Sequence, residues 1–218
     1  LETAEQEFRV ARMAPHGGLE QRHHARLEHV AERIVERAKP APRRKPGPLV
    51  PIGQELAQFD GTLTFRNTSA LERDPMLALR LYDEVLQSKK PPYGYARDAV
   101  VRGSQDADWC RRLRENPDSG PLFVRLLTAV ERSGMRRGSL PSELHAVGLT
   151  LAMVPEMEPL VGRVIHDVYH VYTFDVHCLR ALDRLRALAR GKRFEHLGLA
   201  RRLAAEMPRR APVHMAAF

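Results

Sequence analysis

A long amphipathic stretch reads Thr173-Phe174-Asp175-Val176-His177-Cys178-Leu179-Arg180-Ala181-Leu182-Asp183-Arg184-Leu185-Arg186-Ala187-Leu188-Ala189. We expect its large apolar residues to be the buried ones when the stretch folds as a helix: Val176, Leu179, Leu182, Leu185 and Leu188. Thr173 is a suitable N-cap residue, so the helix is expected to begin at Phe174. The stretch therefore predicts a helix that buries one apolar side.

Most of the chain between Asn67 and this helix is also expected to be helical. Asp74-Pro75 favours a helix start, because proline fits the first helical turn, and the prolines of Lys89-Lys90-Pro91-Pro92 end that helix. Gly134 is expected to end a later helix. The remaining predictions are helices at about 95–101, 106–115, 121–133 and 143–152, then a turn at Pro155 and Pro159.

One short segment favours β-structure. Asp60-Gly61 separates Glu55-Leu56-Ala57-Gln58-Phe59 from Thr62-Leu63-Thr64-Phe65-Arg66. Asp-Gly between two such runs is typical of a tight hairpin, because both turn residues adopt positive φ. The predicted fold class is therefore mostly α, an irregular helical bundle with one short β-hairpin.

The N-terminal part is expected to form a helix and a linker. Leu27, Val30, Ile34 and Val35 lie at helical spacing, and residues 39–51 hold five prolines and four basic side chains. We predict three parts: a helix and basic linker within 1–51, a helical middle region with the hairpin over 52–160, and a third helical part over 161–218.

Composition narrows the class of protein. The 218 residues contain two cysteines, Cys110 and Cys178, which indicates an intracellular chain with buried thiols and no disulfide scaffold. Charged residues interrupt every apolar run, so no membrane-spanning helix is expected. The net charge of +8 allows an acidic partner, but an aromatic content of 6% disfavours nucleic-acid binding.

Three histidines lie within twelve residues, at His166, His170 and His177. In an unbroken helix they would share one face, with His170 about 40° and His177 about 20° from His166, as metal ligands can. His166-Asp167-x-x-His170 also imitates a zinc-protease signature, but Asp is shorter than the usual Glu, and Thr173 is expected to separate two helices. The alternative is a row of polar residues in a groove between helices.

The stretch 166–180 resembles the segment that leads into the phosphohydrolase domain of the bifunctional PII-protein uridylyltransferase/uridylyl-removing enzymes. The similarity extends over most of 19–190. Its other elements are the helix that contains Arg22-His23-His24-Ala25-Arg26, the Phe59-Asp60-Gly61 hairpin, and Glu72-Arg73-Asp74-Pro75 with Leu77 and Leu79.

The resemblance implies an enzyme that uses UTP to uridylylate the PII signalling protein and that removes UMP by metal-dependent hydrolysis when glutamine is abundant. In that family Mg²⁺ or Mn²⁺ is the cofactor, and the enzymes are cytoplasmic. The 1–51 part then corresponds to the edge of a nucleotidyltransferase domain, and 161–218 to the first helices of an HD-type phosphohydrolase domain. His177 matches the first metal ligand, with His170 and His166 as neighbours whose roles stay open.

We expect the chain to be a fragment with no complete site and no stably bound metal. It begins at Leu1, after the place of the family's Gly-Ser loop and paired aspartates, and ends at Phe218, before the place of the hydrolase His-Asp doublet. A single imidazole does not hold a divalent cation that needs several ligands. The alternative function is a non-catalytic basic helical module that binds an acidic protein or nucleic acid.

Overall fold

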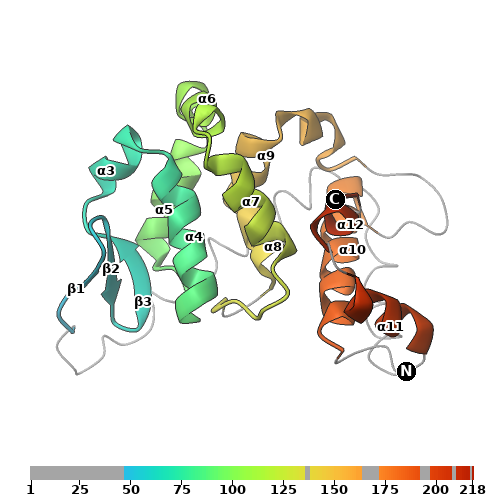
Figure 1. Ribbon diagram of the computed structural model, residues 1–218. Coiled ribbons are helices and arrows are strands. Elements are labelled where there is room, and N and C mark those ends of the chain that lie inside the picture. Colours follow the sequence, from blue (N-terminus) through green and yellow to red (C-terminus); the bar gives the residue numbers. More distant parts are fainter. Residues whose placement is uncertain (1–46, 136–137, 164–171, 192–196, 208–209, 217) are drawn as a thin grey trace, which may run out of the picture.

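The computed structural model describes residues 47–135, 138–163, 172–191, 197–207, 210–216 and 218. Figure 1 shows a small sheet at one end, a central group of helices beside it, and the C-terminal helices at the other end. This arrangement confirms the predicted fold class. The predicted helix with its apolar positions between Leu27 and Val35 lies outside the described residues, as does most of the predicted linker.

The sheet contains the predicted hairpin and one further strand. β2 (Leu56–Phe59) pairs antiparallel with β3 (Thr62–Phe65), and Asp60 and Gly61 adopt φ of 47° and 75° in the turn between them. β1 (Val50–Ile52) pairs with the other side of β2, within a segment that was partly assigned to the linker. Pro51 can occupy it because an edge strand does not need every backbone N–H.

The first two helices begin just after Asn67 and Asp74, whose side chains each accept a hydrogen bond from a backbone N–H of the first turn. α3 (Thr68–Arg73), which the sequence analysis missed, starts at Asn67, whose side chain accepts a hydrogen bond from the Ser69 backbone N–H at 3.0 Å. α4 (Met76–Ser88) begins after Asp74-Pro75 as predicted and ends where Lys89 adopts the left-handed conformation, with φ of 60°.

Three more helices follow close to their predicted positions. They are α5 (Gly94–Gly103), α6 (Ala107–Glu115) and α7 (Ser119–Thr128). α7 ends five residues before the predicted end at Ser133, so Gly134 does not terminate it. Gly134 instead lies against the end of α4, where a Cβ atom would come within 2.2 Å of the Lys89 carbonyl carbon. Close backbone packing therefore requires this glycine.

The helix predicted at 143–152 is two helices in the structure. α8 (Leu140–Ala146) starts at Ser139, whose side chain accepts a hydrogen bond from the Ser142 backbone N–H. Gly148 adopts φ of 83° and separates α8 from α9 (Leu149–Met153), because a left-handed residue interrupts helical hydrogen bonding. A 3₁₀ helix, η1 (Pro155–Leu160), occupies the predicted proline turn.

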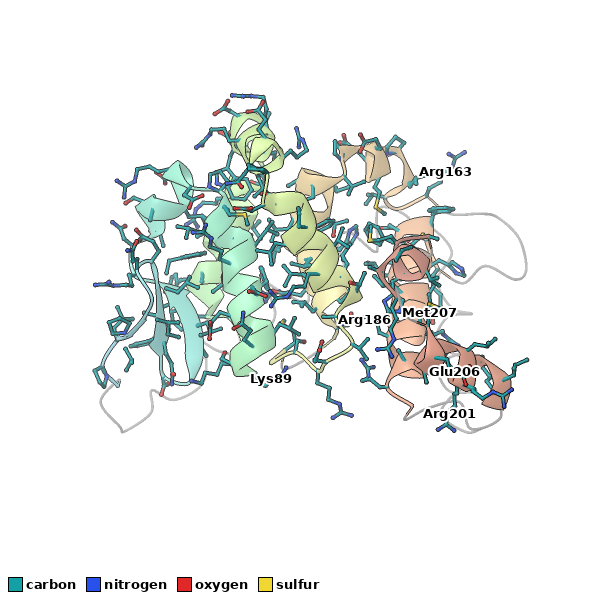
Figure 2. The ribbon with its side chains drawn as sticks, viewed as in Figure 1. Lys89, Arg163, Arg186, Arg201, Glu206 and Met207 are labelled. Carbon is teal, nitrogen blue, oxygen red and sulfur yellow. The ribbon has the colours of Figure 1, made fainter. Side chains whose placement is uncertain are left out.

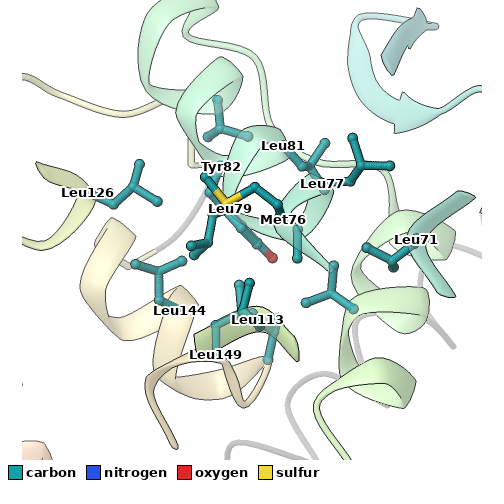
Figure 3. Packing of buried hydrophobic residues seen from close by; sticks show 14 of the residues in the cluster. Leu71, Met76, Leu77, Leu79, Leu81, Tyr82, Leu113, Leu126, Leu144 and Leu149 are labelled. Carbon is teal, nitrogen blue, oxygen red and sulfur yellow. The ribbon is translucent and has the colours of Figure 1, made fainter. Parts of the chain in front are cut away.

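The core lies between α4 and the helices around it. Figure 3 shows Met76, Leu79 and Tyr82 of α4 surrounded by leucines of neighbouring helices, among them Leu113, Leu126, Leu144 and Leu149. Leu79, Tyr82 and these four leucines have no exposed surface. Cys110 and Cys178 are buried as predicted, and both are free thiols whose pKa is raised by burial.

The C-terminal helices pack against α7 and the rest of the bundle. α10 (Phe174–Ala189) matches its prediction, and Leu182 on it belongs to the same core cluster as α4. Arg186 of α10 is buried and donates a hydrogen bond to the Ala129 carbonyl at the end of α7 (Figure 2). Two shorter helices, α11 (Gly198–Glu206) and α12 (Arg210–Ala216), follow. Among the described helices, none is long and apolar enough to cross a membrane.

Candidate functional site

The first turn of α10 carries the predicted metal ligand. The backbone N–H of His177 donates to the Thr173 carbonyl at 2.8 Å, which is a hydrogen bond within the helical turn. The backbone N–H of Phe174 donates to the Arg163 carbonyl at 3.0 Å, which joins the start of α10 to the segment after η1. Thr173 is the N-cap residue, as predicted. His177 is exposed, which leaves its imidazole on the outer side of α10.

Asp175, two residues earlier, points to the opposite side and is buried, with a side chain 5% exposed. Its Oδ2 lies 3.0 Å from Nε2 of His145, and its Oδ1 accepts a hydrogen bond from the Gly162 backbone N–H at 3.2 Å. Burial alone would raise the pKa of Asp175, but hydrogen bonds from His145, Thr173 and Gly162 lower that pKa to about 2. Asp175 is therefore a buried carboxylate that stays charged at neutral pH.

His145 brings α8 into contact with the first turn of α10. The preceding residue on α8, Leu144, is fully buried in the core, and this fixes the helix beside Asp175. Nε2 of His145 faces the carboxylate, so the geometry places the ring proton there. Among the described residues, the buried Nδ1 of His145 has no hydrogen-bond partner.

A second buried carboxylate lies on the same helix. Glu143 accepts a hydrogen bond from the Tyr82 hydroxyl at 2.9 Å and forms an ion pair with Arg97, whose Nε and Nη2 lie 2.5 Å and 2.8 Å from the two carboxylate oxygens. Burial, and then the charge of Glu143, raise the pKa of Tyr82. This cluster joins α4, α5 and α8, and it makes α8 a rigid support for His145.

Of the three histidines predicted at the site, the structure describes one. His177 is described, whereas His166 and His170 lie outside the described residues, so the proposed metal face of three imidazoles is not tested. Within the described part of the chain, no group of three or more His, Cys, Asp or Glu side chains could hold a metal ion. An exposed imidazole fits a divalent cation chemically as one ligand among several.

A cleft of about 310 Å³ lies between α3, α5 and α6, on the far side of the bundle from α10 (Figure 1). Trp109 forms part of its wall and donates a hydrogen bond to the Leu71 carbonyl at 2.9 Å. Arg112 at its rim is already bound to the carbonyls of Glu72 and Arg73. His177, which is the predicted site residue that the structure describes, does not line this cleft.

Asp175, His145 and Glu143 were not among the residues predicted from the sequence. Asp175 carried a usable signal, because an acidic residue in the first turn after an N-cap is favoured by the helix dipole. His145 carried none, since its partner is 30 residues away and only the folded chain brings the two together.

The chain is similar to several known proteins that are each named a bifunctional uridylyltransferase/uridylyl-removing enzyme. The enzyme from Stutzerimonas stutzeri is 27% identical over 172 residues, which is 78% of this chain and 18% of the enzyme. That from Azotobacter vinelandii is 25% identical over the same lengths. That from Pseudomonas fluorescens is 26% identical over 201 residues, 87% of this chain and 20% of the enzyme.

The predicted resemblance is confirmed. The chain is similar to these bifunctional enzymes over most of its length, and it spans about a fifth of theirs. No protein-family model matches the chain, and no solved structure matches it.

Proposed function

We propose that this chain is part of a bifunctional enzyme that uses UTP to uridylylate the PII protein and removes UMP again by metal-dependent hydrolysis. The chain contributes the helical middle region and the first helices of the hydrolase part. His177 is one ligand of the hydrolase metal, either Mg²⁺ or Mn²⁺.

One observation supports this proposal above the others. The similarity to enzymes that are named for both activities covers 78–87% of the chain, so it extends over most of its length. The alternative, a non-catalytic basic module, rests only on the net charge of +8. That alternative does not explain the similarity to these enzymes.

The position of His177 suits its proposed role. Its imidazole lies on the exposed side of α10, while the other side of the same turn is held to α8 and to the segment after η1. A metal held there would activate water for attack on the phosphate of the uridylylated protein. The described residues of α10 hold and orient one imidazole, and further ligands must come from elsewhere.

The test is His177→Ala in the enzyme that contains this segment. We expect loss of UMP removal with unchanged UMP transfer, because the two reactions use separate sites. Loss of a ligand that binds the metal directly should cost more than the 10–100-fold typical of a supporting residue. Both rates are measured on one preparation.

His170→Ala and His166→Ala serve as comparison variants. If either variant loses less UMP removal than His177→Ala does, that histidine is a supporting residue and does not bind the metal directly. Circular dichroism establishes that each variant is folded. If folded His177→Ala keeps full hydrolysis, or loses both activities, His177 is not the metal ligand.

A further inference from the structure

Asp175 and His177 lie on the same turn of α10 and face opposite ways. Residues two apart on an α-helix are separated by about 200° around its axis. The side chain of Asp175 is 5% exposed, whereas His177 is exposed to solvent. Whatever holds Asp175 in the interior therefore also sets the direction in which His177 projects.

Asp175 is held by groups from two other segments of the chain. Nε2 of His145, on α8, lies 3.0 Å from one carboxylate oxygen, and the backbone N–H of Gly162 donates to the other at 3.2 Å. A buried charge is costly unless such partners satisfy it, so any rotation of the turn that broke these contacts would be strongly unfavourable. The rotation of the turn is thereby fixed.

The support behind His145 is rigid. On α8, Leu144 is fully buried, and Glu143 is tied to Tyr82 and Arg97 of two other helices. α8 is capped at its start by Ser139. A continuous series of packed and hydrogen-bonded groups thus connects the core to Asp175.

We infer that Asp175, held by His145, is the positioning residue for His177. The pair fixes the rotation of the first turn of α10 and with it the place of the metal-binding imidazole. This inference rests on the proposed function, since it takes His177 as a ligand of the hydrolase metal.

The test measures Mn²⁺ binding by electron paramagnetic resonance in the enzyme that contains this segment, together with both reaction rates. Asp175→Asn and His145→Ala are each expected to weaken Mn²⁺ binding at the hydrolase site about 10–100-fold and to raise the Mn²⁺ concentration needed for UMP removal. UMP transfer stays unchanged. His145→Gln keeps an N–H donor toward Asp175 and should restore most of the lost affinity.

Leu113→Ala is the matched control. It removes a fully buried side chain on α6, outside the series of contacts that leads from Glu143 and His145 to Asp175, so it should lower the melting temperature without changing Mn²⁺ affinity. A purely structural role for Asp175 predicts the opposite relation, in which loss of stability and loss of Mn²⁺ affinity rise together in all the variants.

Two results would separate failure of this inference from failure of the proposed function. If His177→Ala loses Mn²⁺ while Asp175→Asn and His145→Ala bind it normally, Asp175 does not position His177 and the proposed function stands. If His177→Ala retains both Mn²⁺ binding and UMP removal, the proposed function itself is wrong. Should Asp175→Asn not fold, the comparison of His145→Ala with His145→Gln decides the inference.

Discussion

Three buried charged side chains in the described part of the chain are each held by specific partners. Glu143 is paired with Arg97, Asp175 faces His145, and Arg186 binds a backbone carbonyl and Asp183. An isolated buried charge is far more costly than a paired one. The contacts of Glu143 with Arg97, of Asp175 with His145 and of Arg186 with the Ala129 carbonyl therefore also hold one helix to another. These contacts therefore determine how the helices are placed relative to one another, in addition to stabilising the fold.

His214 is a buried histidine with a different environment. It lies on α12, 4% exposed, with a hydrogen bond to the Thr128 backbone and with Arg186 and Arg210 nearby. Burial first, and then the two arginines, lower its pKa below the ordinary 6.5. The folded chain therefore favours the neutral imidazole.

We expect this histidine to make the fold sensitive to mild acid. As the pH falls below 6.5, the unfolded chain takes up a proton before the folded chain does, so the free energy of unfolding decreases until the lowered pKa is reached. His214→Gln removes this titration. Urea unfolding at pH 7.5 and 5.5 should show a smaller loss of stability for His214→Gln than for the unaltered chain. Equal losses would mean that His214 does not titrate as its burial indicates.

At the scale of helices, local signals predicted starts better than ends. Asp74-Pro75 and Thr173 gave correct starting points, because a cap or a first-turn proline acts within a few residues. The predicted role of Gly134 as a helix end was wrong, and Gly148 interrupts the helix that was predicted at 143–152. One is needed for close contact with the end of α4 and the other takes a left-handed conformation between two helices, and neither role is visible without the neighbouring backbone.

The inner side of α10 was predicted correctly in its centre. Leu179 and Leu182 are buried, whereas Val176, Leu185 and Leu188 are only half-buried. Cys178 and Arg186 are buried instead. Residues alternately three and four apart share one side of an α-helix, whereas a strict spacing of three moves about 60° around the helix at each step.

Leu182→Ala should lower the free energy of unfolding by roughly 2–4 kcal/mol, because Leu182 is fully buried in the core cluster and its removal leaves a cavity. Arg184→Ala, two residues away on the exposed side, should cost less than about 0.5 kcal/mol. Urea denaturation of both variants measures the difference. Similar losses would show that α10 packs through another side.

For the molecule as a whole, the types of secondary structure could be predicted from the sequence, whereas the boundaries between parts of the chain could not. The mostly helical class and the small sheet follow from periodicity and from Asp60-Gly61. The boundary between 52–160 and 161–218 stays a prediction, and Leu182 lies in one core cluster with residues of the central bundle. Contacts such as His145 with Asp175 join the two parts and follow only from the folded arrangement.

The chain alone is expected to lack uridylyltransferase activity. Nowhere in its 218 residues is there a glycine-rich loop followed by paired aspartates, and phosphoryl-type chemistry needs metal-held charge at the transferring phosphate. The measurement is incubation of the chain with labelled UTP, Mg²⁺ and PII protein, with the enzyme that contains this segment as the positive control. We expect label on PII only with that enzyme. Any transfer by the chain alone would place a complete transferase site within these residues. It would contradict the proposal that this chain contributes the helical middle region and the first helices of the hydrolase part.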